Sequence, residues 1–82
     1  MIHFKVILQD SDKVQQHPTV YIETNLETLV IELWEKLKRN PSETARYHIY
    51  VNDVNDAGYI GYVHNGRFEQ EHGYRNYLKQ IL

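Results

Sequence analysis

The 82-residue chain contains no cysteine. Disulfide bonds, zinc-thiolate sites and a thiol nucleophile are therefore excluded together, and small secreted domains usually depend on such cross-links. The sequence thus favours a cytoplasmic setting. Long apolar runs are absent too: no stretch approaches the roughly 18 residues that a membrane-spanning helix needs, and Lys5 interrupts the apolar start. We expect neither a membrane span nor an export signal.

Proline, glycine and an excess of one charge are also scarce. The chain has 2 prolines and 4 glycines, and its hydrophobic fraction of 41% and charged fraction of 24% are close to globular averages, which argues against disorder. Nine basic and 11 acidic residues are interspersed and give a formal charge of -2. This balance does not predict a strongly basic nucleic-acid surface. The length suits one compact domain, residues 1–82.

Alternation of apolar and polar residues predicts the strands of a sheet, because successive side chains of a strand point to opposite faces. In the second predicted strand, Val20 and Ile22 are expected to point inward. Asn65-Gly66 predicts a tight hairpin turn, since both central residues of a type I′ turn need positive φ. The predicted strands cover residues 1–10, 19–23, 45–52, 59–64 and 67–71.

Two segments have helical periodicity. Thr24 and Glu27 have the spacing of a capping box, which predicts that a helix begins here. Asn40-Pro41 ends it, because proline disfavours helical backbone at the preceding residue. A second short amphipathic helix follows Gly73 and runs to the terminus. The apolar stripe of the first helix consists of Leu26, Leu29, Val30, Leu33 and Leu37.

These elements predict an α+β domain with the order β-β-α-β-β-β-α, in which one mixed or antiparallel sheet is packed by one main helix. The helix must lie on the sheet, because an isolated segment of this length is marginal in water. The opening β-β-α-β portion is similar in element order to β-grasp, ubiquitin-like domains. That resemblance concerns topology alone and implies no functional residue.

The sequence has no group of residues with the spacing of a catalytic or metal site. If Ile49 and Val63 pair on the inward face, His48 lies opposite His64, which makes half a metal site. Asp53 and Asn55 match a calcium-binding loop, but no suitable ligands occupy its fifth and twelfth positions. We therefore predict no enzyme, no catalytic residue, no metal and no cofactor. A metal-binding protein or a small enzyme subunit remains a third alternative.

The outward face of the predicted sheet carries aromatic and basic residues together. Tyrosine and arginine are enriched at the centres of protein interfaces, and they also stack on bases and contact phosphates. Glu69 and Glu71 dilute the positive potential that nucleic acid requires, so a protein partner is favoured, with a purely structural face and a nucleic-acid site as alternatives. A slip of strand 59–64 by one residue would turn Ile60 and Tyr62 inward. The candidate partner-binding residues of this face are Arg46, His48, Tyr50, Tyr62, His64 and Arg67.

A second candidate surface lies on the first helix. Ile31 falls about 100° from Val30 on the helical wheel, among charged residues, and Trp34 lies at the edge of the apolar stripe. Trp34 is interpreted as the border of the core and Ile31 as a contact for a partner, which a second copy of the chain could also be. Together the two surfaces predict a non-enzymatic interaction module that docks on a larger protein. A small regulatory or inhibitory protein, of the kind that phages and mobile elements encode, fits this size and composition.

Overall fold

The computed structural model describes residues 2–22, 24–52, 54 and 56–81, and it confirms the α+β class. Glu23 at the end of the predicted second strand, Asp53 and Asn55 of the calcium-like loop, and Leu82 lie outside the described residues. The predicted order β-β-α-β-β-β-α is followed, with one further two-residue strand after the first. The strands are β1 Phe4–Asp10, β2 Lys13–Val14, β3 Thr19–Tyr21, β4 Ala45–Val51, β5 Tyr59–His64 and β6 Arg67–Gln70; the helices are α1 Leu26–Lys38 and α2 Gly73–Ile81, with a 3-10 turn η1 at Asp56–Gly58.

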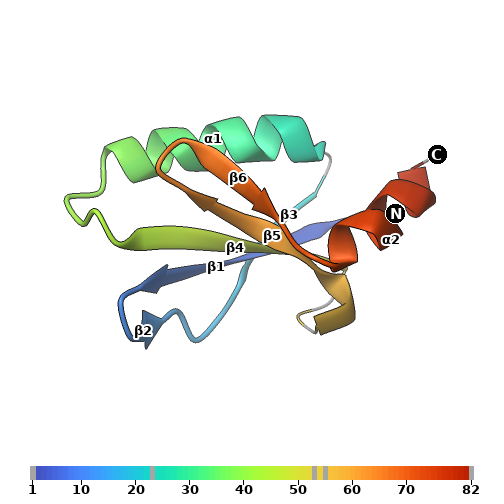
Figure 1. Ribbon diagram of the computed structural model, residues 1–82, viewed down its shortest axis with the longest axis horizontal. Helices are drawn as coiled ribbons and strands as arrows, with labels where there is room; N and C mark the ends of the chain where they lie inside the picture. Colours follow the sequence, from blue (N-terminus) through green and yellow to red (C-terminus); the bar gives the residue numbers. More distant parts are fainter. Residues whose placement is uncertain (1, 23, 53, 55, 82) are drawn as a thin grey trace.

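All strands belong to one antiparallel sheet with the order β2-β1-β4-β5-β6, and β3 pairs with β1. β2 and β3 share one edge of β1, because β2 pairs with residues 9–10 and β3 with residues 4–6. Helix α1 runs along one side of this sheet and α2 lies at one end of it (Figure 1). The likeness to β-grasp domains therefore stays one of element order along the chain.

The core lies between α1 and one face of the sheet, which we call the inner face. Leu29 and Leu33 of α1 are fully buried there, as the apolar stripe predicts. Tyr77 of α2 completes this core, with its ring centroid 5.7 Å from that of Phe4. Helix α2 therefore packs on its own sheet. The sheet contributes Phe4, Val6, Ile49, Val51, Ile60 and Val63.

Helix α1 begins one residue later than the capping box predicts. The N-cap is Asn25, whose side-chain oxygen accepts a hydrogen bond from the Thr28 backbone N–H at 2.8 Å. The Thr24 hydroxyl instead donates to the Asn25 carbonyl at 3.4 Å. Both residue types cap helices well, but asparagine ranks above threonine at this position. The capping-box assignment of Thr24 was therefore wrong.

The inward orientation predicted for Val20 and Ile22 is also wrong. Their side chains are 54% and 60% exposed, and Tyr21 between them packs against the core. The register explains this, because Tyr21 lies opposite buried Phe4 and directly opposed residues point to the same face. The Tyr21 hydroxyl accepts a 2.8 Å hydrogen bond from the Lys36 ammonium, which connects β3 to α1.

A bulge in β5 decides which side chains reach the other face of the sheet. Ile49 lies opposite Gly61 and Tyr50 lies opposite Tyr59, so that Ile60 is an extra residue with no counterpart on β4. The predicted pairing of Ile49 with Val63 was therefore wrong by two residues. Because of the bulge, Ile60 and Val63 both point inward while Tyr59 and Tyr62 both point outward. The turn between β5 and β6 is as predicted, with positive φ values of 50° at Asn65 and 70° at Gly66.

Candidate functional site

The sheet face that points away from α1 is the first candidate site, and we call it the outer face. In the described part of the chain, the core side chains of both helices lie on the inner side, so this face is not covered by them. The structure brings all six sheet residues of the predicted site to it. It adds Tyr59, which the sequence did not reveal, and the exposed Val14 and Val20, which lie opposite Gln9 and Lys5 of β1. The predicted residues are Arg46, His48, Tyr50, Tyr62, His64 and Arg67.

His48 is at the centre of a hydrogen-bond chain on the outer face. Its Nδ1 lies 2.7 Å from the Tyr59 hydroxyl and its Nε2 lies 2.6 Å from Gln9 Oε1. Gln9 Nε2 donates to the Ser11 carbonyl at 3.0 Å, which leaves its oxygen facing His48 as an acceptor. The His48 proton therefore lies on Nε2, and Nδ1 accepts the proton of the Tyr59 hydroxyl. Both ring nitrogens of this neutral histidine are occupied.

Aromatic contacts extend this chain into a compact group. The Tyr50 and Tyr59 ring centroids are 5.0 Å apart, and the Tyr62 ring lies 5.8 Å from that of His48. The Arg46 guanidinium lies 5.0 Å from the centroid of the Tyr62 ring, in a cation–π contact. All five side chains are half-buried. Arg46, His48, Tyr50, Tyr59 and Tyr62 are called the outer-face cluster below.

Burial determines the charge state of the cluster. Burial, and secondarily the nearby positive charge of Arg46, lower the pKa of His48 below its ordinary value. Burial is also the largest cause of a raised pKa for the Tyr59 hydroxyl, and Glu71 adds to it. Both groups are therefore neutral near pH 7, and Arg46 carries the charge of the cluster.

The lowered pKa of His48 predicts a pH-dependent stability. Histidines of the unfolded chain titrate near pH 6.5, and the folded protein protonates His48 less readily, so the free energy of unfolding should fall as the pH drops below about 6.5. Denaturant titrations at a series of pH values between about 7.5 and 5 measure this slope. The His48→Gln variant should show a shallower decline. An unchanged slope in the variant would mean that His48 protonates equally well in both states.

His64 and Arg67 lie apart from the cluster, toward the β5–β6 turn, where they oppose each other across the hairpin. His64 Nδ1 donates to the Ala45 carbonyl at 3.0 Å. His48 lies opposite Tyr62, so the predicted pairing of His48 with His64 does not form. Among the described residues, no three histidine, aspartate or glutamate side chains come together in a way that could hold a metal ion.

The hydroxyl side chains near the end of β1 have a different arrangement. The Asp10 carboxylate accepts hydrogen bonds from Ser42 Oγ at 2.7 Å and from Thr44 Oγ1. The hydrogen bond from Thr44 is the largest cause of a lowered pKa for Asp10, and the hydrogen bond from Ser42 is the next largest. The contacts join the segment before β4 to the end of β1, which is a structural role for both hydroxyls.

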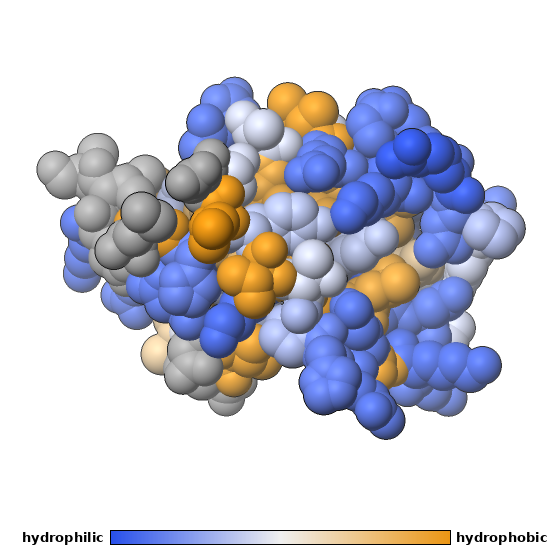
Figure 2. Space-filling view, turned by 180° about the vertical axis from the view of Figure 1, so that it is seen from behind, coloured by the Kyte–Doolittle hydropathy of each residue, from blue (hydrophilic) through white to orange (hydrophobic). Residues whose placement is uncertain are grey.

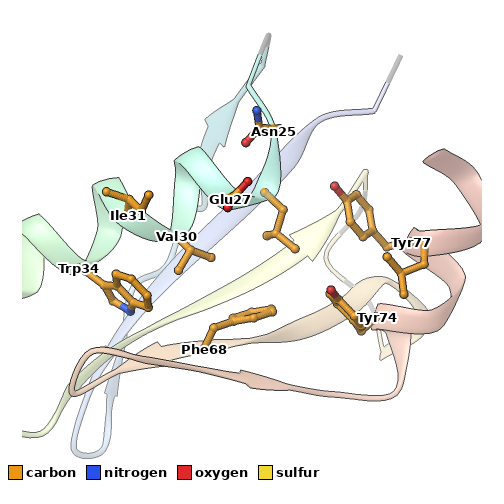
Figure 3. Close-up of a pocket in the computed structure, with 10 residues that line it drawn as sticks. Asn25, Glu27, Val30, Ile31, Trp34, Phe68, Tyr74 and Tyr77 are labelled. Atoms are coloured by element: carbon orange, nitrogen blue, oxygen red, sulfur yellow. The ribbon is translucent and has the colours of Figure 1, made fainter. Parts of the chain in front are cut away.

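The second candidate site is a groove between α1 and α2, with a volume of about 680 Å³. Trp34 borders the core, and its indole N–H approaches the Arg67 carbonyl at 3.5 Å. Ile31 is 51% exposed at the rim. Figure 3 shows Val30 and Trp34 on the side of α1 toward Phe68 of β6, with Tyr74 and Tyr77 projecting from α2 at the other end of the groove. The groove is lined by Asn25, Leu26, Glu27, Val30, Ile31, Trp34, Phe68, Tyr74, Tyr77 and Leu78.

Apolar atoms reach the surface in several separate places on the side of the molecule seen in Figure 2, between stretches of hydrophilic side chains. Among the described residues, this side therefore shows no single apolar expanse of the kind that marks a large interface. None of the helices in the described residues is long and apolar enough to cross a membrane.

Comparison with known proteins assigns no family to the chain. It matches no protein-family model, and no curated protein and no solved structure shows a significant match to it. The outer face and the groove between the helices are therefore the features from which a function can be inferred.

Proposed function

We propose that the protein is a non-enzymatic interaction module, a small regulatory or inhibitory protein that binds a larger protein through its outer face. The observation that carries this proposal is the outer-face cluster, in which tyrosine, arginine and histidine side chains are joined on the sheet face opposite the one that the described helices pack against. Tyrosine and arginine are the residue types that contribute most at the centres of protein interfaces. The exposed Val14 and Val20 add apolar area to the same face.

The hydrogen bonds within the cluster favour binding for a second reason. Ordering a long side chain at an interface costs roughly 0.5–1.5 kcal/mol of conformational entropy. In this protein His48 is held by Gln9 on one side and by Tyr59 on the other. Tyr50 contacts Tyr59, and Tyr62 is fixed between His48 and Arg46. Much of that ordering is therefore complete before a partner arrives.

The arrangement favours a protein partner over nucleic acid. A base would stack on a free aromatic face, but the Arg46 guanidinium already lies over the Tyr62 ring. Glu69 lies directly opposite Tyr62 and places a negative charge beside it. Nucleic acid would be repelled by this carboxylate, whereas a protein partner can supply a matching cation.

The same contacts support a role other than catalysis. A general base must have a ring nitrogen within hydrogen-bond reach of the substrate. Both nitrogens of His48 are engaged by Gln9 and Tyr59. In this proposal His48 therefore holds the side chains of Tyr59 and Gln9 in place on the outer face, and proton transfer is assigned to no residue.

The proposal is tested by removing two rings of the face. Tyr50→Ala combined with Tyr62→Ala should weaken partner binding by on the order of thirtyfold or more, since a single residue at an interface centre contributes about 2 kcal/mol or more. The measurement is affinity capture from the native host with the wild-type chain, identification of the partner by mass spectrometry, and titration of the purified partner with each variant. Melting temperatures confirm that the variants are folded.

Matched variants separate the two candidate sites. Ile31→Ala removes an exposed apolar side chain from the groove and should leave binding through the outer face unchanged. If the double tyrosine variant is folded and binds as the wild type does, the outer face is not the partner site. Binding to short DNA or RNA that weakens steeply with added salt would instead support the nucleic-acid alternative.

A further inference from the structure

Strand β6 forms a free edge of the sheet. The opposite edge is different, because β2 and β3 both pair along β1. Within the residues that the structure describes, β6 pairs with β5 alone. An edge strand presents backbone N–H and C=O groups that can pair with another chain. The residues of β6, Arg67–Gln70, are exposed except for the half-buried Phe68.

The β5–β6 hairpin fixes which backbone groups point outward. In a hairpin with a two-residue turn, the residues that flank the turn exchange backbone hydrogen bonds, and every second pair after them does so too. The Glu71 N–H donates to the Ile60 carbonyl at 3.0 Å, which continues this alternation. Arg67, Glu69 and Glu71 therefore face β5. The backbone groups of Phe68 and Gln70 face away from the sheet.

The groove between α1 and α2 lies beside this edge. Phe68 lines it from β6, while Ile31 and Trp34 line it from α1 (Figure 3). A strand that paired with the free edge of β6 would turn its inward side chains toward this groove. The occupant must therefore have an extended backbone and apolar side chains on one side.

We propose that the occupant is a second copy of this chain, with β6 paired antiparallel to β6 of the second copy about a two-fold axis at Phe68. The two Phe68 residues exchange both backbone hydrogen bonds and place their rings side by side on the inner face. On the outer face, Arg67 of each copy lies directly opposite Glu69 of the other. Two ion pairs form in this way from one strand, because a two-fold interface uses the same surface twice.

Charge selects this register over its neighbours. If one β6 strand slides by two residues along the other in one direction, Glu69 lies opposite Glu69. If it slides by two residues in the other direction, Arg67 lies opposite Arg67. Like charges directly opposite each other destabilise a strand pair. The register centred on Phe68 is the one among these three in which every directly opposed charged pair has opposite signs.

The groove contributes the remaining contact area. Stable protein interfaces usually bury about 1,200–2,000 Å² in total, which a four-residue strand cannot supply alone. In the two-fold arrangement, the grooves of the two copies meet above the paired strands. The apolar side chains of one groove then cover those of the other groove, with Ile31, Trp34 and Phe68 contributed by each copy. This contact gives the exposed Ile31 an apolar neighbour.

Charge reversal tests this dimer without any other partner, and it does not depend on the proposed function of the outer face. Arg67→Glu places two glutamates opposite each other at both positions, and Glu69→Arg does the same with arginines. Each variant alone should raise the dimer dissociation constant about tenfold, from the known size of cross-strand charge effects. An equimolar mixture of the two variants restores both ion pairs and should dimerise as tightly as the wild type. Sedimentation over a concentration series and native mass spectrometry measure the species.

Lys13→Glu is the matched control, because it makes the same charge change on β2 at the opposite edge of the sheet; it should not alter dimerisation. A wild-type chain that is monomeric up to its solubility limit overturns the proposal and leaves an extended segment of another protein as the occupant. A dimer that tolerates both charge reversals overturns it as well. Weakening by Arg67→Glu but not by Glu69→Arg contradicts the register, since it indicates Glu69 opposite Glu69.

Discussion

Replacing Gly61 by alanine is expected to lower the free energy of unfolding by on the order of 4 kcal/mol, which approaches the whole stability of a small domain. Gly61 has φ of +147°, a conformation that residues with a side chain rarely adopt. A Cβ atom here would collide with the Glu69 carbonyl oxygen and lie 2.9 Å from the Phe68 ring. Neither can withdraw easily, because the Glu69 backbone belongs to the β5–β6 ladder and Phe68 packs against the core.

Gly66→Ala is the matched control for this prediction. Gly66 also has positive φ, at 70°, but nothing lies within 4 Å of the position that a Cβ atom would take. The backbone conformation alone should therefore cost about 1 kcal/mol. Chemical denaturation followed by circular dichroism compares the two variants. Equal losses at Gly61 and Gly66 would show that the close approach of β6 at Gly61 has no energetic consequence.

The parts of the fold that could be predicted are those encoded by local pattern. The alternation in Ala45–Val51, the apolar stripe of α1 and the Asn65-Gly66 turn each depend on a few neighbouring residues. Side-chain periodicity follows directly from backbone geometry, so such segments can be assigned without tertiary contacts. For this reason, the prediction that Arg46, His48 and Tyr50 point to the outer face was correct.

The prediction of which side chains point inward was wrong where this orientation depends on pairing with distant strands. β3 has three residues, too few for alternation to distinguish an inward Tyr21 from an inward Val20. Its phase is decided by Phe4 of β1, which lies opposite Tyr21, and by the hydrogen bond from Lys36 to the tyrosine hydroxyl. Aromatic and β-branched residues are both good strand formers, so propensity did not help.

The outer-face cluster could be predicted only in part, because its centre depends on the bulge at Ile60. A single extra residue moved Tyr59 to the outer face beside His48 and kept Ile60 in the core. The one signal in the sequence was Gly61, since an isolated glycine inside a strand often marks a bulge or a close backbone approach. The other partner of His48, Gln9, lies 39 residues away, and no local pattern indicates it.

Removing the Tyr77 side chain should also cause a large loss of stability. Tyr77 is 6% exposed and packs against Phe4 of β1 and Tyr74 of its own helix. Truncation of such a buried aromatic side chain typically costs about 3–5 kcal/mol. Helix α2 has 9 residues and is too short to persist without this contact. Tyr77→Ala should therefore lower the melting temperature and also release α2, which forms one wall of the groove.

Two further variants separate the contribution of the Tyr77 ring to stability from that of its hydroxyl and from that of an exposed residue on the same helix. Asn76→Ala changes the exposed neighbour on the same helix and should alter the free energy of unfolding by no more than about 0.5 kcal/mol. Tyr77→Phe keeps the ring but removes the hydroxyl. Burial raises the pKa of this hydroxyl above its ordinary value, and its hydrogen bond with the Leu26 backbone opposes part of that rise. Losing that hydrogen bond should cost about 1 kcal/mol. If Tyr77→Ala is no more harmful than Asn76→Ala, α2 does not dock on the core, and the groove between the helices loses its second wall.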